Sequence, residues 1–346
     1  MKQEMPSFKA VQPQSMPSAR PAQGYFSVPF SELCTAWLKR QAVRVKSTTL
    51  STYSYVVDAH LVPFWGAREQ MSNDALCDFS LYLRQRGNRT TGGALSQQTV
   101  RGILRILESV ITYGINACYI SNFYFETTRL YAVSEKVPVL NNVQQAQLES
   151  LLFDTPDLWS LGVLTTLYTG LRIGELCALQ MHDIRLEAGT ICVEKTVQRI
   201  RRTDGGTART CVVVGRPKTE NAVRTIPVPE FLLSVFQKSA AFQSACKQQD
   251  AYFLTGTGIY MEPRLCQYRF ARLKNRSNLP DEVTFHTLRH TFATRCVEYG
   301  FDIKVLSEIL GHASVTTTLD RYVHPDFMRK FENMQRLRPC IGERCS

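Results

Sequence analysis

The segment from His286 to Tyr322 decides how the C-terminal half of this chain is interpreted. It reads His286-Thr-Leu-Arg289-His-Thr-Phe-Ala-Thr, then, further on, Leu-Gly-His312-Ala-Ser-Val-Thr-Thr-Thr-Leu-Asp-Arg-Tyr322. His286 and Arg289 are three apart and share one face of a predicted helix. The glycine before His312 ends a second helix and places that imidazole in a turn, and Tyr322 follows on a short threonine-capped helix. Imidazole, guanidinium and phenol groups can together bind and attack a phosphodiester.

Two motifs far upstream supply further groups of this kind. In Thr-Gly-Leu-Arg172-Ile-Gly-Glu175-Leu, Arg172 lies at a predicted helix N-terminus, where free N–H groups favour an anion. Glu175 lies one turn further on the same face and can hold Arg172 in one rotamer. Lys218, in Gly-Arg-Pro-Lys218-Thr, lies on a predicted hairpin tip from which it can reach a DNA groove. Each motif alone could be ordinary: a surface ion pair, a solubilising edge lysine or a core tyrosine.

The composition is that of a globular protein with a polyanionic partner. The chain has 346 residues, of which 44% are hydrophobic, and a formal charge of +11. Both halves of the chain carry part of this positive charge, +6 in residues 1–139 and +5 in residues 140–346. Both halves could therefore face one long anion such as nucleic acid. There is no apolar run of membrane-spanning length and no signal sequence. The eleven cysteines lack metal-ligand spacing, and we expect a reducing, cytoplasmic setting.

The apolar pattern predicts two folded domains. Residues 1–27 are rich in Pro, Gln and Ser and are predicted to be disordered. Residues 28–120 contain four helical patterns joined by short loops, which predicts an all-α domain; the second helix is expected to be stopped by Pro63 and Gly66. Residues 121–140 are predicted to be a linker, and residues 141–346 a second, mixed domain.

The second domain is predicted to be mainly helical with a small sheet. Helices are expected at about 143–152, 157–168 and 172–179, and again from about residue 229 onward. Three β-branched runs, at 190–193, 210–214 and 224–228, predict a three-stranded antiparallel sheet. The expected fold class is therefore mainly α with a small antiparallel β-sheet.

These motifs together resemble the tyrosine recombinases, or phage-type integrases. That family is marked by Arg, Lys, His-x-x-Arg, Gly-His and a final Tyr, in this order, in a C-terminal catalytic domain. The matching positions are Arg172, Lys218, His286, Arg289, His312 and Tyr322. The resemblance covers about residues 28–335, and the motif sequences are similar to those of integrases of bacterial mobile elements. It implies a helical core-binding domain followed by the catalytic domain.

The resemblance also implies a mechanism. Tyr322 would attack a DNA phosphate and form a 3′-phosphotyrosine link, in a site-specific recombination that integrates or excises a mobile element without metal, ATP or another cofactor. Arg172 and Arg289 would bind the phosphate oxygens with help from His286 and His312, and His286 would help to move the Tyr322 proton. Lys218 would protonate the leaving 5′-oxygen. His290 and His324 are expected to have only structural roles.

The expected partners are double-stranded DNA attachment sites and further copies of the chain. An amphipathic helix at about 326–337 is expected to dock on a neighbouring protomer in a tetramer on DNA, and an accessory DNA-bending or directionality factor is possible. Four basic residues at the end of the first helix are candidate phosphate contacts, although they could equally form a solvated basic face: Lys39, Arg40, Arg44 and Lys46.

Two other functions use similar residues. A type IB topoisomerase relaxes supercoils by the same chemistry, but the Gly-His312 turn and the expected tail helix favour a recombinase. A catalytically inactive DNA-binding protein on the same scaffold is disfavoured because all six site positions are filled.

Overall fold

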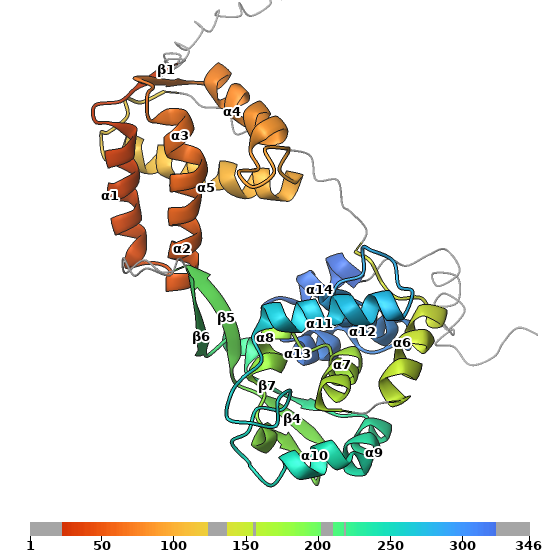
Figure 1. Ribbon diagram of the computed structural model, residues 1–346. Coiled ribbons are helices and arrows are strands. Elements are labelled where there is room, and N and C mark those ends of the chain that lie inside the picture. Colours follow the sequence, from red (N-terminus) through yellow and green to blue (C-terminus); the bar gives the residue numbers. More distant parts are fainter. Residues whose placement is uncertain (1–22, 124–136, 155–156, 202–209, 218, 323–346) are drawn as a thin grey trace, which may run out of the picture. The chain divides into compact units, whose positions relative to one another are not determined.

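The computed structural model describes residues 23–123, 137–154, 157–201, 210–217 and 219–322 (Figure 1). The described residues divide into two compact units, one with residues 23–123 and Arg201, the other with the remaining described residues from 137 onward. Both are mainly helical with small antiparallel sheets, which confirms the predicted fold class. In the described part of the chain, no helix is long and apolar enough to cross a membrane.

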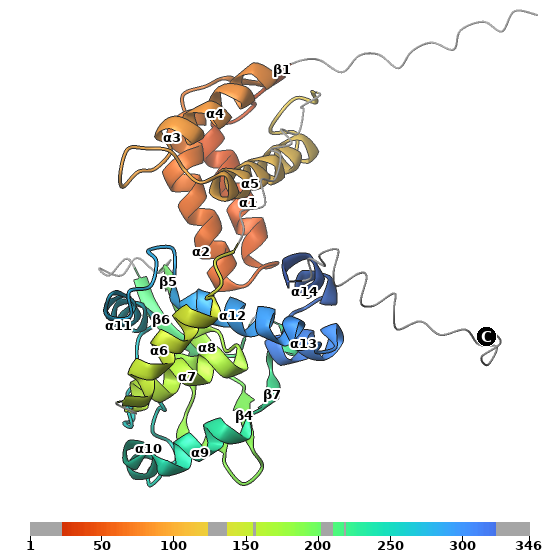
Figure 2. The same ribbon diagram turned by 90° about the vertical axis from the view of Figure 1, so that its right-hand side faces the viewer.

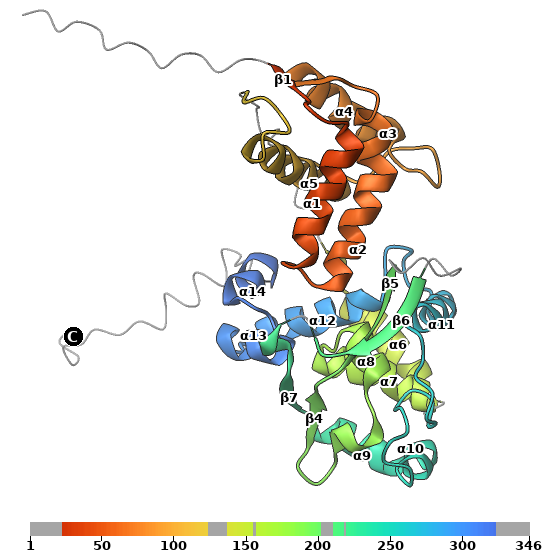
Figure 3. The same ribbon diagram turned by 90° about the vertical axis from the view of Figure 1, so that its left-hand side faces the viewer.

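The N-terminal unit is built on a long amphipathic helix, α5 (Gln97–Asn116), which begins at the Ser96 cap. Its apolar stripe is buried and packs against three other helices, and Figures 2 and 3 show it crossing α1. The other elements are β1 (Gln23–Tyr25), α1 (Phe30–Ala42), α2 (Ser47–Val56), α3 (Val62–Trp65), β2 (Gln70–Ser72) and α4 (Asn73–Arg86).

One prediction for this unit was wrong, and another was correct only in part. Residues 23–25, expected to be disordered, form β1 and pair with β2, and Gly24 permits close contact with the ring of Phe123, which lies 2.4 Å from where a Cβ would stand. The second helical stretch continues through Pro63 and ends at Trp65, so of the two predicted stop residues only Gly66, its C-cap, ends it. A π-helical turn, Val57–Leu61, directly precedes α3, and this wider turn accommodates a proline that has no N–H to donate.

The C-terminal unit is organised around α7 (Leu158–Thr169), which is buried on nearly every face. A helix that is apolar all round belongs in a core, and α7 packs against helices on several sides, among them α12. Gly170 ends it in the left-handed conformation, at φ +67°. The other helices described in this unit are α6 (Asn142–Asp154), α8 (Ile173–Ala178), α9 (Glu230–Lys238), α10 (Ala240–Ala245), α11 (Pro263–Arg276), α12 (Phe285–Glu298), α13 (Ile303–Leu310) and α14 (Val315–Tyr322).

The strands of this unit form two separate sheets, which corrects the predicted strand membership. The three-stranded sheet contains β3 (Ile184–Arg185), β4 (Thr190–Val193) and β7 (Arg224–Pro227). The run at 210–214 belongs instead to β6 (Thr210–Gly215), which pairs with β5 (Thr196–Arg201). The polar residues within β5 obscured its strand pattern in the sequence. Because β5 and β6 are neighbours along the chain, they pair with each other and leave β7 to β4.

We expect Phe253→Ala to destabilise the C-terminal unit by about 3–5 kcal/mol, because it leaves a cavity in the core. Phe253 is 0% exposed and contacts the rings of Phe236 and Phe242. Denaturant unfolding followed by circular dichroism measures the loss. The control, Phe153→Ala at a 42% exposed position, should change the free energy of unfolding by less than about 0.5 kcal/mol; equal effects would contradict the assignment of this core.

Candidate active site

Arg172 is the N-cap of α8, and its guanidinium is held from two sides. Its backbone N–H and its Nη1 donate to the two carboxylate oxygens of Glu175, at 2.9 and 2.8 Å. Its Nη2 donates to the carbonyl oxygen of Gly311 at 3.1 Å. The predicted contact between Arg172 and Glu175 is confirmed. The Arg172 side chain remains 36% exposed, so a ligand can reach it.

Glu175 also binds Arg224, a residue that the sequence analysis missed. Arg224 begins β7, and its Nη1 and Nη2 donate to the Glu175 carboxylate at 3.1 and 2.9 Å. Both side chains are almost fully buried, at 6% and 3% exposure. The available signal was a charged residue at the start of a predicted strand, because a charge that becomes buried there needs a partner.

The C-terminal end of α13 presents three successive carbonyl groups, each of which accepts a hydrogen bond from a different arginine. The pairs are Arg224 Nε with Ile309 at 2.6 Å, Arg289 Nη2 with Leu310 at 2.7 Å, and Arg172 Nη2 with Gly311 at 3.1 Å. The partial negative charge of a helix C-terminus favours cations here. Gly311 turns the chain at φ +63°, and a Cβ at this position would lie 3.0 Å from the carbonyl oxygen of Asn221.

Arg289 lies on α12 and is only 2% exposed. Besides its contact with α13, it donates from Nη1 to the carbonyl of Gly170 at 2.6 Å, and its Nη2 lies 3.0 Å from His312 Nε2. Because a guanidinium only donates, His312 Nε2 must be the acceptor. His312 Nδ1 therefore carries the proton and donates to Thr318 Oγ1, at 2.8 Å.

Tyr322 contacts His290, a residue that was expected to have only a structural role. His290 Nδ1 lies 2.9 Å from the Tyr322 hydroxyl. His286, which was expected to serve the Tyr322 proton, contacts the His290 ring edge-on, with 4.4 Å between ring centroids. The ring of His312 lies parallel to that of Tyr322, at 6.4 Å. The sequence offered one signal for this contact. His290 directly follows Arg289 on α12, and this helix contacts both α13 and α14.

Lys218, His324 and the predicted tail helix lie outside the described residues. The segment that carries Lys218 connects β6 with β7, and these strands belong to different sheets, so the predicted hairpin between them is wrong. The next strand along the chain, β7, begins with Arg224 and is hydrogen-bonded through it to Glu175.

The cluster formed by Arg172, Glu175, Arg224 and Arg289 contains two groups with shifted pKa values, Glu175 and Arg289. Burial raises the pKa of the Glu175 carboxyl, but the charges of Arg224 and Arg172 and their hydrogen bonds outweigh that effect and hold it below its usual range. Burial, and then the charge of Arg172, lower the pKa of Arg289 to about 9. An anion between the two arginines would relieve their mutual repulsion. The cluster is therefore suited to bind a phosphate group.

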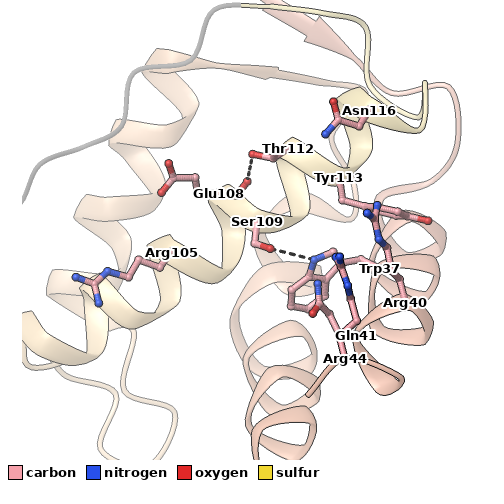
Figure 4. A pocket seen from close by; sticks show the side chains of 10 residues that line it. All are labelled: Trp37, Arg40, Gln41, Arg44, Arg105, Glu108, Ser109, Thr112, Tyr113 and Asn116. Carbon is pink, nitrogen blue, oxygen red and sulfur yellow. Dashed lines mark hydrogen bonds between the residues drawn. The ribbon is translucent and has the colours of Figure 1, made fainter. Parts of the chain in front are cut away.

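The N-terminal unit carries a basic pocket of about 390 Å³ between α1, the turn after it, and α5 (Figure 4). Its lining residues are Trp37, Arg40, Gln41, Arg44, Arg105, Glu108, Ser109, Thr112, Tyr113 and Asn116. The Arg40 guanidinium lies over the ring of Tyr113, 5.2 Å from its centroid. Of the four candidate phosphate contacts, Arg40 and Arg44 line this pocket, whereas Lys39 and Lys46 do not.

The model of the phage integrase family matches residues 140–329, which is more than half of the chain. The chain belongs to the phage integrase family. The matched residues include the whole cluster of Arg172, Glu175, Arg224, Arg289 and His312, together with Tyr322.

Several members of this family are similar to the chain in sequence. The transposase of transposon Tn916 from Enterococcus faecalis is 29% identical over 190 residues, 51% of this chain and 44% of the relative. A XerC-like tyrosine recombinase from Caldanaerobacter subterraneus subsp. tengcongensis is 29% identical over 168 residues, 45% of this chain and 43% of the relative. The integrase of Staphylococcus phage L54a is 28% identical over 158 residues, 45% of each chain. The chain thus matches about half the length of these relatives.

Solved structures of integrases share the fold. The Tn1549 transposon integrase in complex with transposon right end DNA has a TM-score of 0.72 at 24% identity, covering 89% of this chain and 99% of that chain. A lambda integrase tetramer bound to a Holliday junction has a TM-score of 0.56 at 18% identity, covering 84% of this chain and 79% of that chain.

We expect Glu175→Gln to lower the free energy of unfolding by about 3–5 kcal/mol near neutral pH, because it leaves the buried Arg224 without its counter-charge. The folded-state pKa of Glu175 is depressed, so its stabilisation is present above the unfolded value of about 4.3 and is lost as the pH falls through the folded-state pKa. The difference between variant and wild type should therefore shrink below about pH 4.

Denaturant unfolding at neutral and acidic pH tests this expectation. Glu298→Gln is the matched control, because it removes the 47% exposed carboxylate of an ion pair with Arg295 and should cost less than about 1 kcal/mol. A difference that stays constant or grows in acid would show that Glu175 is not the titrating group.

Proposed function

We propose that this protein is a site-specific DNA recombinase that cuts and rejoins DNA through a covalent link to Tyr322. The observation that carries the proposal is the convergence of Arg172, Arg289, His312 and Tyr322 around the end of α13. These are the residue types that phosphate binding and nucleophilic attack require. Membership of the phage integrase family supports the same function.

The proposed reaction is a transesterification. The Tyr322 oxygen forms a bond with the DNA phosphorus, the bond from phosphorus to the 5′-oxygen breaks, and a 3′-phosphotyrosine results. Tyr322 gives its proton to a nearby imidazole, and Lys218 supplies a proton to the leaving 5′-oxygen, a role typically worth about 10²–10⁴-fold in rate. A 5′-hydroxyl from the same or a partner duplex then reverses the step. One ester replaces another of similar energy, so ATP is not required.

Arg172 and Arg289 are proposed to stabilise the negative charge that builds up on the non-bridging oxygens. Preorganised donors of this kind are each worth roughly 3–4 kcal/mol of transition-state stabilisation. The contacts to backbone carbonyls and Glu175 hold both guanidiniums in place before DNA binds. Three of the five N–H donors of Arg289 bind groups within the described residues, and we propose that the other two donate to a phosphate oxygen. His286 and His312 are proposed to add hydrogen bonds there.

The substrate is proposed to be double-stranded DNA at the attachment sites of a mobile element, recombined in the cytoplasm by a tetramer of this chain. The DNA complex of the Tn1549 integrase and the tetramer of lambda integrase on a Holliday junction support these assignments by analogy. A DNA-bending or directionality factor is proposed as an accessory partner. The basic pocket between α1 and α5 is proposed to hold DNA phosphates in the N-terminal unit.

Covalent capture tests the proposed chemistry and identifies the DNA site in the same experiment. Sheared DNA from the source cell is incubated with the protein and denatured, and DNA that remains attached to protein is sequenced. We expect the wild type to retain a discrete set of sequences and Tyr322→Phe to retain none, because phenylalanine has no nucleophilic oxygen. Adducts with Tyr322→Phe, or none with the wild type, would overturn the proposal.

Arg172→Ala should abolish the adduct while DNA affinity changes by only a modest factor, because Arg172 is proposed to act mainly on the transition state. Gel-shift titration and adduct yield on a captured site measure the two effects separately.

The wild-type protein is also expected to exchange strands between two differently labelled duplexes. Relaxation of supercoils without strand exchange would indicate a topoisomerase.

Arg44→Gln combined with Arg105→Gln should weaken binding to any duplex and reduce its salt dependence. Each lost phosphate contact lowers the slope of log affinity against log salt by about 0.9, so the double variant should lose up to about 2. Fluorescence anisotropy with a labelled duplex gives the slope. Lys39→Gln removes a charge from α1 at a position outside the pocket, and should leave the slope nearly unchanged. An unchanged slope in the double variant would exclude the pocket as a phosphate site.

A further inference from the structure

We propose that His290, and not His286, is the base that takes the proton of Tyr322 during strand cleavage. The inference rests on the proposed function, because it requires Tyr322 to be the nucleophile. Its first support is the distance of 2.9 Å between His290 Nδ1 and the Tyr322 hydroxyl. A base must lie within hydrogen-bond reach of the proton that it removes, directly or through one water, and His290 is in direct reach.

The surroundings of the pair fix this contact. The exposed fractions of His290 and Tyr322 are 4% and 8%. The Tyr322 ring belongs to an apolar cluster, and its members include Ala293, Cys296, Val297, Leu306 and Leu310. Apolar packing thus sets the position of the ring, and the contact with His290 sets the direction of the hydroxyl. Exclusion of water strengthens a hydrogen bond of this kind.

Helix geometry explains why the two neighbours Arg289 and His290 have different roles. Successive residues of an α-helix are about 100° apart around its axis. Arg289 accordingly reaches the end of α13, whereas His290 reaches the last residue of α14. His286, one turn earlier on α12, is exposed and lies edge-on to His290. It is therefore placed next to the base and near the surface, where a phosphate oxygen could reach it.

The proposed proton path completes the cleavage step. As the Tyr322 oxygen bonds to phosphorus, its proton passes to His290 Nδ1. The bond from phosphorus to the 5′-oxygen breaks, and that oxygen takes a proton from Lys218. In the rejoining step the 5′-hydroxyl returns a proton to Lys218, and His290 returns its proton to the Tyr322 oxygen. Imidazole suits both directions because it exchanges protons near neutral pH.

The first measurement is the rate of adduct formation on a nicked duplex that carries a captured site. His290→Leu should lower this rate by about 10²–10⁴-fold, the usual contribution of a general base, with DNA affinity within about threefold of the wild type. The variant is then combined with 3,5-difluorotyrosine at position 322. This more acidic phenol depends less on a base, so it should restore the His290→Leu rate by at least about tenfold.

Two further variants separate proton transfer from packing and from the role of His286. Val297→Ala loosens the same apolar cluster at a 6% exposed position, and the fluorinated tyrosine should not correct its defect. The fluorinated tyrosine should likewise not raise the rate of adduct formation by His286→Leu. The inference is overturned if His290→Leu cleaves at the wild-type rate, if the fluorinated tyrosine fails to rescue it, or if His286→Leu is rescued instead. Wild-type adduct formation would still support the proposed function in each case, whereas its absence would overturn both.

Discussion

The arrangement of the candidate site depends on one buried carboxylate. Glu175 binds Arg172 on its own helix and Arg224 on β7, at distances of 2.8–3.1 Å. Burying a charge is costly unless it is paired, so the three groups must stay together. The carboxylate thereby joins helix α8 to the strand that follows the Lys218 segment. Arg172, which is proposed to bind phosphate, and the start of β7 thus share one anchor.

The cluster carries more positive than negative charge, and the helix ends compensate for part of the difference. Arg289 is buried with a single direct contact to another ionisable side chain among the described residues, the neutral His312. Its other described partners are carbonyl groups at the ends of α7 and α13. Backbone dipoles can stabilise a guanidinium without cancelling its charge. An incoming phosphate therefore still meets a strong positive field.

Much of the fold and of the candidate site could be predicted from the sequence, because the relevant signals were local. The turn at Gly311, the pairing of Arg172 with Glu175 and most helix positions follow from capping, spacing and periodicity. Arg224 and His290 could not be assigned, because their roles depend on contacts with residues 49 and 32 positions away. The pairing of β5 with β6 was missed because polar residues in β5 hide its alternation. Roles that depend on such long-range contacts can be assigned only when the fold is known.

The row of carbonyls at 309, 310 and 311 has a consequence for how this family can vary. Every residue type offers a carbonyl group, so the side chains at 309 and 310 can change without removing an acceptor for Arg224 or Arg289. Inserting or deleting one residue there would instead shift all three acceptors against their arginines at once. Evolutionary drift at this helix end should therefore proceed by substitution, while its length stays constant.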